Sequence, residues 1–274
     1  MSTEIFEIVP GDGPVVLAQP HGGTWLPEDL RARLNARGQG LDDTDWHIAR
    51  LYEGLLPSAT VVRMNVHRYA IDANRDPGGA SLYPGQNTTE LCPTTDFDGN
   101  PIWQDGQAPS KDEIAARTDR YHRPYHAALA DALDAVRAAH GVAVLYDCHS
   151  IRSEIPYLFE GRLPVFNIGT NEGVTCAEVL AAETETLCAA SPHDSVRDGR
   201  FKGGWTTRHY GRPGEGLHAI QMEIAQRAYM EEAAPWEYRP DRADLLRPHL
   251  GAILARLDIL ARSGDLIQQD GDAT

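Results

Sequence analysis

The sequence predicts an α/β protein, a three-layer α/β/α sandwich with a mixed, largely parallel sheet. Two observations lead to this fold class. Short apolar runs rich in β-branched residues, each bounded by Gly, Pro or polar clusters, are typical of strands. Segments with helical periodicity separate these runs. Strands that alternate with helices favour a parallel or mixed sheet covered on both faces.

Five runs carry the strand pattern. They lie at 14–20, 58–66, 142–148, 164–168 and 217–224. Each is short enough for one strand of a buried sheet.

Helical segments are indicated by apolar residues at spacings of three and four. The first follows a capping box, in which Ser110 and Glu113 are placed to bond each other's backbone N–H groups. A short helix is also expected through Ile48, Leu51 and Tyr52. The apolar positions of the three longer helices are Ile114, Tyr121, Tyr125, Ala128, Ala132 and Val136; Val174, Ala177, Ala181, Thr184 and Cys188; and Leu246, Leu250, Ile253, Leu257 and Leu260.

The chain has 274 residues and a mass of 30.1 kDa, a size that open α/β enzymes reach without dividing. We therefore expect one domain over 1–274. Residues 76–109 are rich in Gly, Pro, Asn and Thr and show no sustained period. So long a loop predicts either a lid or substrate-facing flap, or a surface insertion with a small hairpin.

Charge and composition exclude several classes of partner. Acidic residues outnumber basic ones 40 to 25, and the net charge of -15 repels nucleic acid and anionic membrane surfaces. An anionic substrate would need positive charge gathered locally. The N-terminus has no secretion signal, and no apolar run approaches the roughly 18 residues of a membrane span. The 4 cysteines include no CxxC pair. These features predict a cytoplasmic protein with reduced thiols; the oligomeric state stays open.

Polar residues stand where predicted strands end. His21 follows one strand, His149 follows another, and Glu223 lies within the last run. In a doubly wound sheet, the two histidines would project at one carboxyl edge, where such folds bind ligands. The two glycines after His21 would leave the backbone open to a ligand or metal. A histidine after a strand is also commonly a packed or capping residue. The prediction of a functional site therefore depends mainly on the expected convergence of these three side chains.

Two further clusters have both structural and functional interpretations. Asp43 and Asp45 belong to an acidic run that starts a predicted helix, and we expect one residue of this run to cap it. His122 and His126 share a helix face as metal-binding pairs do. Pro124 and aromatic neighbours favour packing and hydrogen bonding for His122. His126 could instead reach the site and support a residue that binds the metal.

Two segments could bind an anion. Asn74 and Arg75 offer amide and guanidinium donors that suit a carboxylate, although Arg75 could instead pair with Asp72 in a turn. Lys202 and Arg208 lie among glycines and form a second candidate anion site.

Six motifs in order resemble the N-formylglutamate amidohydrolase family over roughly residues 12–262. They are PHGG at 20–23, DTDW at 43–46, DANR at 72–75, DCHS at 147–150, GGWTTRHYG at 203–211 and AIQMEIAQRAYM at 219–230. That family is similar in turn to zinc carboxypeptidases and aspartoacylase-type deacylases, so the resemblance implies a zinc-exopeptidase-like fold.

The resemblance also implies roles for particular residues. It implies that His21, Asp45 and His149 hold one divalent metal, zinc first among the candidates, with Asp43 the competing carboxylate. Carboxypeptidases have a glutamate three residues after the first histidine, but Thr24 stands there, so DTDW supplies the carboxylate instead.

The same resemblance implies that Glu223 is the catalytic acid and base, and that Asn74 with Arg75 binds a substrate carboxylate. Arg208 and Lys202 have no counterpart in the family pattern and are assigned to substrate binding by their charge alone.

The function implied is hydrolysis of N-formyl-L-glutamate to formate and L-glutamate, a step of histidine degradation, by metal-activated water. The partner is then a small N-acyl amino diacid. Covalent catalysis is disfavoured because no GxSxG motif is present and strand alternation turns Cys148 away from His149. The alternatives are another metal-dependent N-acyl amino acid deacylase or carboxypeptidase-like hydrolase, and, outside enzymes, a carboxylate-binding protein without turnover.

Overall fold

The computed structural model describes residues 4–80 and 85–266. Within them a sheet of 7 strands has the order β1-β3-β2-β4-β7-β5-β6. Strands β3, β2, β4 and β7 run parallel to one another, β1 and β5 pair antiparallel with their neighbours β3 and β7, and β6 is parallel to β5. The sheet is therefore mixed and largely parallel, as the sequence predicts.

The bounds of the elements are as follows. The strands are β1 (Phe6–Val9), β2 (Val15–Gln19), β3 (Thr60–Met64), β4 (Ala143–Ile151), β5 (Phe166–Gly169), β6 (Ser195–Arg197) and β7 (Leu217–Ala225). The α-helices are α1 (Glu28–Arg33), α2 (Ala36–Gly40), α3 (Ile48–Tyr52), α4 (Lys111–Arg117), α5 (Arg123–His140), α6 (Glu178–Ala189), α7 (Trp205–Tyr210) and α8 (Pro240–Arg262), with short π or 3-10 turns at Thr118–His122, Pro213–Glu215 and Gln226–Ala228.

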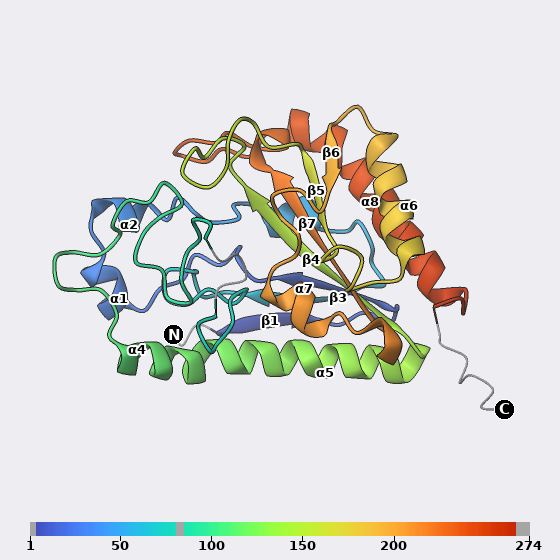
Figure 1. Cartoon of the computed structure of the whole chain (residues 1–274), viewed down its shortest axis with the longest axis horizontal. Coiled ribbons are helices and arrows are strands. Elements are labelled where there is room, and N and C mark those ends of the chain that lie inside the picture. The colour runs from blue at the N-terminus through green and yellow to red at the C-terminus, as the bar shows by residue number, and fades with distance from the viewer. Residues whose placement is uncertain (1–3, 81–84, 267–274) are drawn as a thin grey trace.

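Helices cover both faces of the sheet, which confirms the α/β/α prediction. Helix α5 lies along one face, and α6 and α8 lie on the other (Figure 1). Alternate residues of a strand point to opposite faces, so the central strands feed two cores. Leu17 and Tyr146 pack with α8, whereas Val16 and Leu145 pack with α5. Full burial of one such aliphatic side chain contributes about 1.5–3 kcal/mol.

On the α5 side, two central strands change from apolar to polar along their length. Leu145 of β4 is followed on the same face by Asp147 and His149, and Ala219 of β7 is followed by Gln221 and Glu223. On this face, the first residues of each strand belong to the core against α5. The polar residues form the carboxyl end of the sheet, where open α/β folds place their ligands.

The boundaries differ from the sequence predictions in several places. Strands β1 and β6 were not predicted, because each is short and lies among polar residues. Strand β4 continues to Ile151, so His149 lies inside it and does not follow it. Helix α6 begins at Glu178, and Val174 is exposed before it. The capping box of Ser110 and Glu113 is confirmed at the start of α4.

The described parts of 76–109 contain no named helix or strand, but the segment is packed. Leu91 and Trp103 are buried, and Thr95 pairs with Pro101 in a single antiparallel bridge. Asn87, Thr88, Thr89 and Phe97 line a cavity at the carboxyl end of the sheet. The segment therefore contains one antiparallel bridge and borders the cavity, and its role as a lid or flap stays a prediction.

None of the helices in the described part of the chain combines the length and apolar character needed to cross a bilayer.

Candidate active site

Two histidines and one aspartate converge at the carboxyl end of the sheet. Nδ1 of His21 lies 3.1 Å from Nδ1 of His149, and Oδ2 of Asp45 lies 3.4 Å from His149 Nδ1 and 3.9 Å from His21 Nδ1. All three side chains are buried. Bonds of roughly 2 Å to a tetrahedral zinc place ligand atoms about 3.4 Å apart. The three atoms therefore have the spacing of three ligands of one metal ion.

Each histidine has a buried carboxylate beside its other ring nitrogen. His21 Nε2 hydrogen bonds Asp72 Oδ1 at 2.7 Å, and His149 Nε2 lies 3.1 Å from Asp147 Oδ1, a buried oxygen with no hydrogen-bond partner among the described residues. Because a carboxylate accepts a hydrogen bond, Asp72 favours the proton on Nε2 of His21 and a lone pair on its Nδ1. In the tautomer of His149 with the proton on Nε2, that proton faces Asp147 and Nδ1 also carries a lone pair.

Two lone pairs and a carboxylate oxygen then face one another, and a cation between them would satisfy all three. Metal-binding histidines are commonly backed by carboxylates in this way. The donor set of His21, Asp45 and His149 therefore fits a divalent metal. Among the described residues, this is the group of His, Cys, Asp and Glu side chains whose ligand atoms come close enough to share an ion.

Asp45 reaches the histidines because two groups fix both of its oxygens. Arg68 donates to Oδ1 at 2.6 Å, and the backbone N–H of Ser150 donates to Oδ2 at 3.0 Å. Burial opposes ionisation of Asp45, but Arg68 and the two histidines outweigh it and hold its pKa below the usual value. This carboxylate is charged and oriented before any metal binds.

Asp43 points away from the histidines. Its Oδ2 accepts hydrogen bonds from the Tyr69 hydroxyl and the Phe97 backbone N–H, both at 2.9 Å. Burial raises the pKa of Asp43 to about 7. Asp43 thus anchors the segment around Phe97. The expectation that the acidic run caps α3 is wrong, because the N-cap is His47 and no side chain caps that helix.

Glu223 stands beside His149 on the neighbouring strand. The two residues are direct partners in the register of β4 and β7, and both line the cavity. Gln221 Nε2 donates to Glu223 Oε2 at 3.3 Å. Burial raises the pKa of Glu223 to about 8. A carboxyl group with a pKa near neutrality is suited both to accept and to return a proton.

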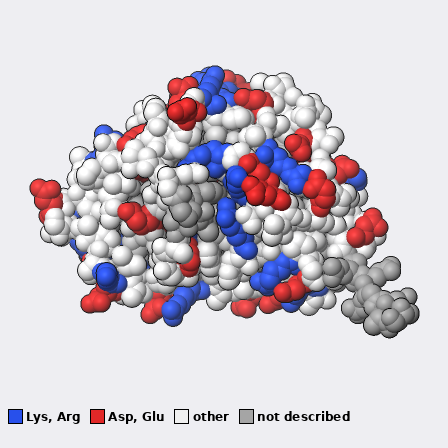
Figure 2. Space-filling model, in the orientation of Figure 1, with Lys and Arg blue, Asp and Glu red and all other residues white. Residues whose placement is uncertain are grey.

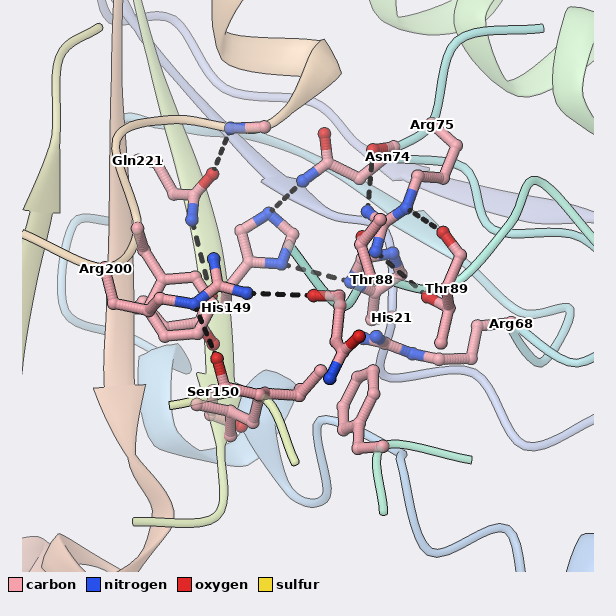
Figure 3. Close-up of a pocket in the computed structure, with 17 residues that line it drawn as sticks. His21, Arg68, Asn74, Arg75, Thr88, Thr89, His149, Ser150, Arg200 and Gln221 are labelled. Carbon is pink, nitrogen blue, oxygen red and sulfur yellow. Dashed lines mark hydrogen bonds between the residues drawn. The ribbon is translucent and has the colours of Figure 1, made fainter. Parts of the chain in front are cut away.

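Asn74 joins this cluster from the segment after β3. Its Nδ2 lies 3.1 Å from His149 Nε2, and its Oδ1 accepts a hydrogen bond from the Thr206 backbone N–H at 2.8 Å (Figure 3). The amide can approach α7 because residue 204 is glycine. A Cβ on Gly204 would lie 2.2 Å from Asn74 Nδ2.

The histidine pair on the long helix holds the backbone around Asn74. His122 Nε2 bonds the Arg75 carbonyl at 3.0 Å, and His126 Nε2 bonds the Ala73 carbonyl at 2.7 Å. The hydrogen-bonding role expected for His122 is confirmed, and His126 supports the backbone next to a cavity residue. Pro124 has no N–H to give to the preceding turn, which accounts for the π-helical turn there.

Arg75 lies beside the cluster and is tethered to the loop. Its Nε donates to the Thr89 carbonyl and its Nη2 to Thr89 Oγ1, at 2.9 and 3.0 Å, and Nη1 lies 3.6 Å from Asp72 Oδ2. Arg75 therefore pairs with Asp72, as the alternative prediction stated, and it also lines the cavity.

The structure brings two unpredicted arginines, Arg68 and Arg200, to the cavity. Arg68 sits in HRYAIDANR without a motif of its own, and Arg200 lies in a polar stretch before GGWTTRHYG, so no sequence signal distinguished either. Lys202 and Arg208, which were predicted to bind substrate, are not among the described lining residues. Lys202 pairs with Glu172 at 2.6 Å, and Arg208 Nε donates to the Gly203 carbonyl.

Two other expectations concern residues next to the histidines. Cys148 belongs to the core on the α8 side, opposite His149, as strand alternation predicts.

The glycines after His21 serve packing. A Cβ at Gly22 would lie 2.8 Å from Ile48, and a Cβ at Gly23 would lie 2.4 Å from the backbone of Asn65. Close approach of this protein's own chain explains these glycines.

Comparison with known proteins gives a consistent result. The family model for N-formylglutamate amidohydrolase matches residues 13–230. N-formylglutamate deformylase from Pseudomonas aeruginosa is 43% identical over 256 residues, which cover 93% of this chain and 96% of the relative. The enzyme of the same name from Pseudomonas putida is 44% identical over 248 residues, with 88% and 92% covered.

A solved structure agrees in fold as well as sequence. The crystal structure of N-formylglutamate amidohydrolase from Ralstonia eutropha JMP134 superposes with a TM-score of 0.79 at 27% identity, covering 94% of this chain and 98% of the other. A family model that spans most of the chain and two relatives above 40% identity lead to one conclusion. This chain belongs to the N-formylglutamate amidohydrolase family.

Proposed function

We propose that this protein hydrolyses N-formyl-L-glutamate to formate and L-glutamate, with a divalent metal held by His21, Asp45 and His149. The observation that carries the proposal is the convergence of two imidazole Nδ1 atoms and one carboxylate oxygen within 3.9 Å. Relatives named N-formylglutamate deformylase, more than 40% identical over most of the chain, supply the substrate.

The metal proposed is zinc, although a set of two histidines and a carboxylate also accepts cobalt, iron or manganese. When bound in such a set, zinc acts as a Lewis acid and lowers the pKa of water to about 7. Asp72 and Asp147 hold the rings of His21 and His149 in place, and Arg68 fixes Asp45. The chain thus organises the ligands in advance.

Glu223 is the residue proposed to move the proton. It accepts the proton that the water loses as the water oxygen bonds to the formyl carbon. It then delivers that proton to the amide nitrogen as the C–N bond breaks, which releases formate and glutamate. A pKa near neutrality favours both transfers, and the register of β4 and β7 keeps Glu223 beside His149.

Asn74 and Arg75 are proposed to bind a carboxylate of the substrate. Both line the cavity, and both are anchored from behind, Asn74 by Thr206 and Arg75 by Thr89. A side chain held in advance loses little entropy when it binds, so the reacting group is positioned at low cost.

The test combines metal analysis with formate release. Purified protein should contain about one equivalent of divalent metal. It should release formate from N-formylglutamate much faster than it releases acetate from N-acetylglutamate or succinate from N-succinylglutamate. Removal of the metal with a chelator should abolish turnover, and addition of zinc should restore it. Full activity in protein stripped of metal would contradict the metal assignment, and preference for another acyl group would contradict the substrate.

A further inference from the structure

Among the described residues that line the cavity, three arginines occupy different positions: Arg68, Arg75 and Arg200. Arg68 is buried, donates to Asp45 Oδ1 at 2.6 Å and lies 4.0 Å from Asp72 Oδ2. Two carboxylates of the protein balance its charge, so its role is to orient Asp45.

Arg75 stands next to the reacting centre. Its Nη1 lies 3.6 Å from Asp72, whose other oxygen bonds His21, and the preceding residue, Asn74, contacts His149. A carboxylate held by Arg75 and Asn74 is therefore close to the metal ligands. In N-formylglutamate the α-carboxylate is attached to the carbon that carries the formamido nitrogen. The α-carboxylate is thus the one that fits the position of Arg75.

Arg200 reaches the cavity from the opposite side. It follows β6, and Figure 3 shows its guanidinium and that of Arg75 on opposite sides of the His149 ring. Its Nε donates to the Leu158 carbonyl at 3.0 Å and its Nη2 to the Asn87 carbonyl at 3.2 Å. Its guanidinium carbon also lies 5.3 Å from the centre of the Phe201 ring. Two loops and an aromatic ring therefore orient this side chain in advance.

The distribution of charge supports an anionic ligand here. The chain carries a net charge of -15, yet Arg68, Arg75 and Arg200 all line the cavity. Figure 2 shows Lys and Arg side chains near the middle of this face, with Asp and Glu side chains beside them. The two named carbonyl partners of Arg200 are neutral acceptors that orient its guanidinium.

We propose that Arg200 binds the side-chain carboxylate of the substrate and selects formyl derivatives of acidic amino acids, while Arg75 binds the α-carboxylate. This inference rests on the proposed function and assigns one carboxylate of the substrate to each of two arginines. The side-chain carboxylate lies further from the formyl carbon than the α-carboxylate does. It therefore fits Arg200, whose named contacts are with Leu158, Asn87 and Phe201. Arg75, by contrast, lies 3.6 Å from Asp72, the carboxylate that bonds His21.

The experiment compares three substrates with the holoenzyme: N-formylglutamate, N-formylglutamine, which lacks the side-chain charge, and N-formylisoglutamine, which lacks the α-charge. Wild type should prefer N-formylglutamate over both amides. Arg200→Gln should lower kcat/KM for N-formylglutamate by about 10- to 100-fold, as expected for a lost hydrogen bond to a charged group. It should lower kcat/KM for N-formylglutamine little, so discrimination between these two substrates disappears.

Arg75→Gln should give the opposite pattern and remove discrimination against N-formylisoglutamine. Arg200→Lys keeps the charge without the planar donor pair and should retain part of the preference. Arg212→Gln is the matched control, because Arg212 pairs with Glu215 on the surface, and it should behave as wild type.

Two outcomes overturn the inference. The first is a folded Arg200→Gln with wild-type kcat/KM for both N-formylglutamate and N-formylglutamine. The second is a folded Arg200→Gln that loses kcat/KM equally for both substrates, which indicates a structural role. If Arg200→Gln does not fold, the ratio measured with Arg200→Lys decides in the same way. Failure of wild type to release formate from N-formylglutamate would instead contradict the proposed function.

Discussion

Nδ1 of His21 lies 3.1 Å from Nδ1 of His149, although 128 residues separate the two in sequence. Burial opposes a positive charge on His149, but the carboxylates of Asp147, Asp45 and Glu223 outweigh it and raise its pKa above the usual value. The surroundings of this pair therefore favour positive charge, and a cation that replaces the proton between the two Nδ1 atoms would meet the same carboxylates. This pair is therefore the physical basis of the proposed metal site.

The choice between the two aspartates gives a direct prediction. Asp45→Asn should lower the bound metal by at least about tenfold, because the neutral amide replaces the charged ligand. Asp43→Asn should keep the metal, since Asp43 bonds Tyr69 and Phe97 instead of facing the histidines. Metal content after dialysis, measured by atomic spectroscopy, checks both variants. Loss of metal in Asp43→Asn with retention in Asp45→Asn would reverse the assignment.

Glu223→Gln separates binding of the metal from catalysis. The amide has nearly the same shape but cannot accept the proton, so kcat should fall by about 10²- to 10⁴-fold. The metal content should stay at the wild-type level because Glu223 is not part of the ligand set. Formate release and metal analysis on the same sample test this. A variant that keeps wild-type kcat would show that another group moves the proton.

Gly204→Ala tests whether the placement of Asn74 matters. The new Cβ would lie 2.2 Å from Asn74 Nδ2, so the amide must move away from its position beside His149. We expect kcat/KM to fall by about 10- to 100-fold, the size of effect that a displacement of about 1 Å produces. Gly214→Ala is the control, because nothing lies within 4 Å of its added Cβ. Equal activity of the two variants would argue against a role for Asn74.

His126 makes stability depend on pH in a defined direction. Burial lowers the pKa of His126 to about 3, whereas an unfolded histidine has a pKa of about 6.5. Between these values the unfolded state binds more protons, so the free energy of unfolding falls as pH decreases below about 6.5. His126→Gln keeps a donor for the Ala73 carbonyl but does not titrate.

Urea unfolding at pH 7.5 and 5.5 measures this contribution. Wild type should lose about 1 kcal/mol more stability than His126→Gln between these two conditions. The variant should also start from a similar stability at pH 7.5, where the histidine is neutral in both states. Parallel losses in the two proteins would show that His126 does not contribute.

Much of the fold could be predicted from local patterns. Apolar runs located the central strands, and a capping box located the start of α4, because both depend on residues close in sequence. The short strands β1 and β6 were missed because their formation depends on pairing with a neighbour. The end of β4 was misplaced because its last residues, which include the polar His149 and Ser150, are buried and continue the pairing with β7.

Site residues that lie in a family motif could be predicted from the sequence. Residues that reach the site only through tertiary contacts could not. His21, His149, Glu223 and Asn74 lie in family motifs, and the structure brings them to one cavity. Arg200 has no motif, and the cavity includes it because the segment after β6 meets the loops that contain Asn87 and Leu158. Lys202, only two residues further, pairs with Glu172 instead.

The sequence by itself determined the fold class, the order of the central strands along the chain and the residue types available for chemistry, since periodicity and motifs are local properties. Only the tertiary structure decided that Asp45 and not Asp43 meets the histidines, and that Arg200 lines the cavity. Those outcomes depend on strand register and on contacts between distant loops. Such contacts set the direction of each side chain, and no pattern of neighbouring residues encodes them.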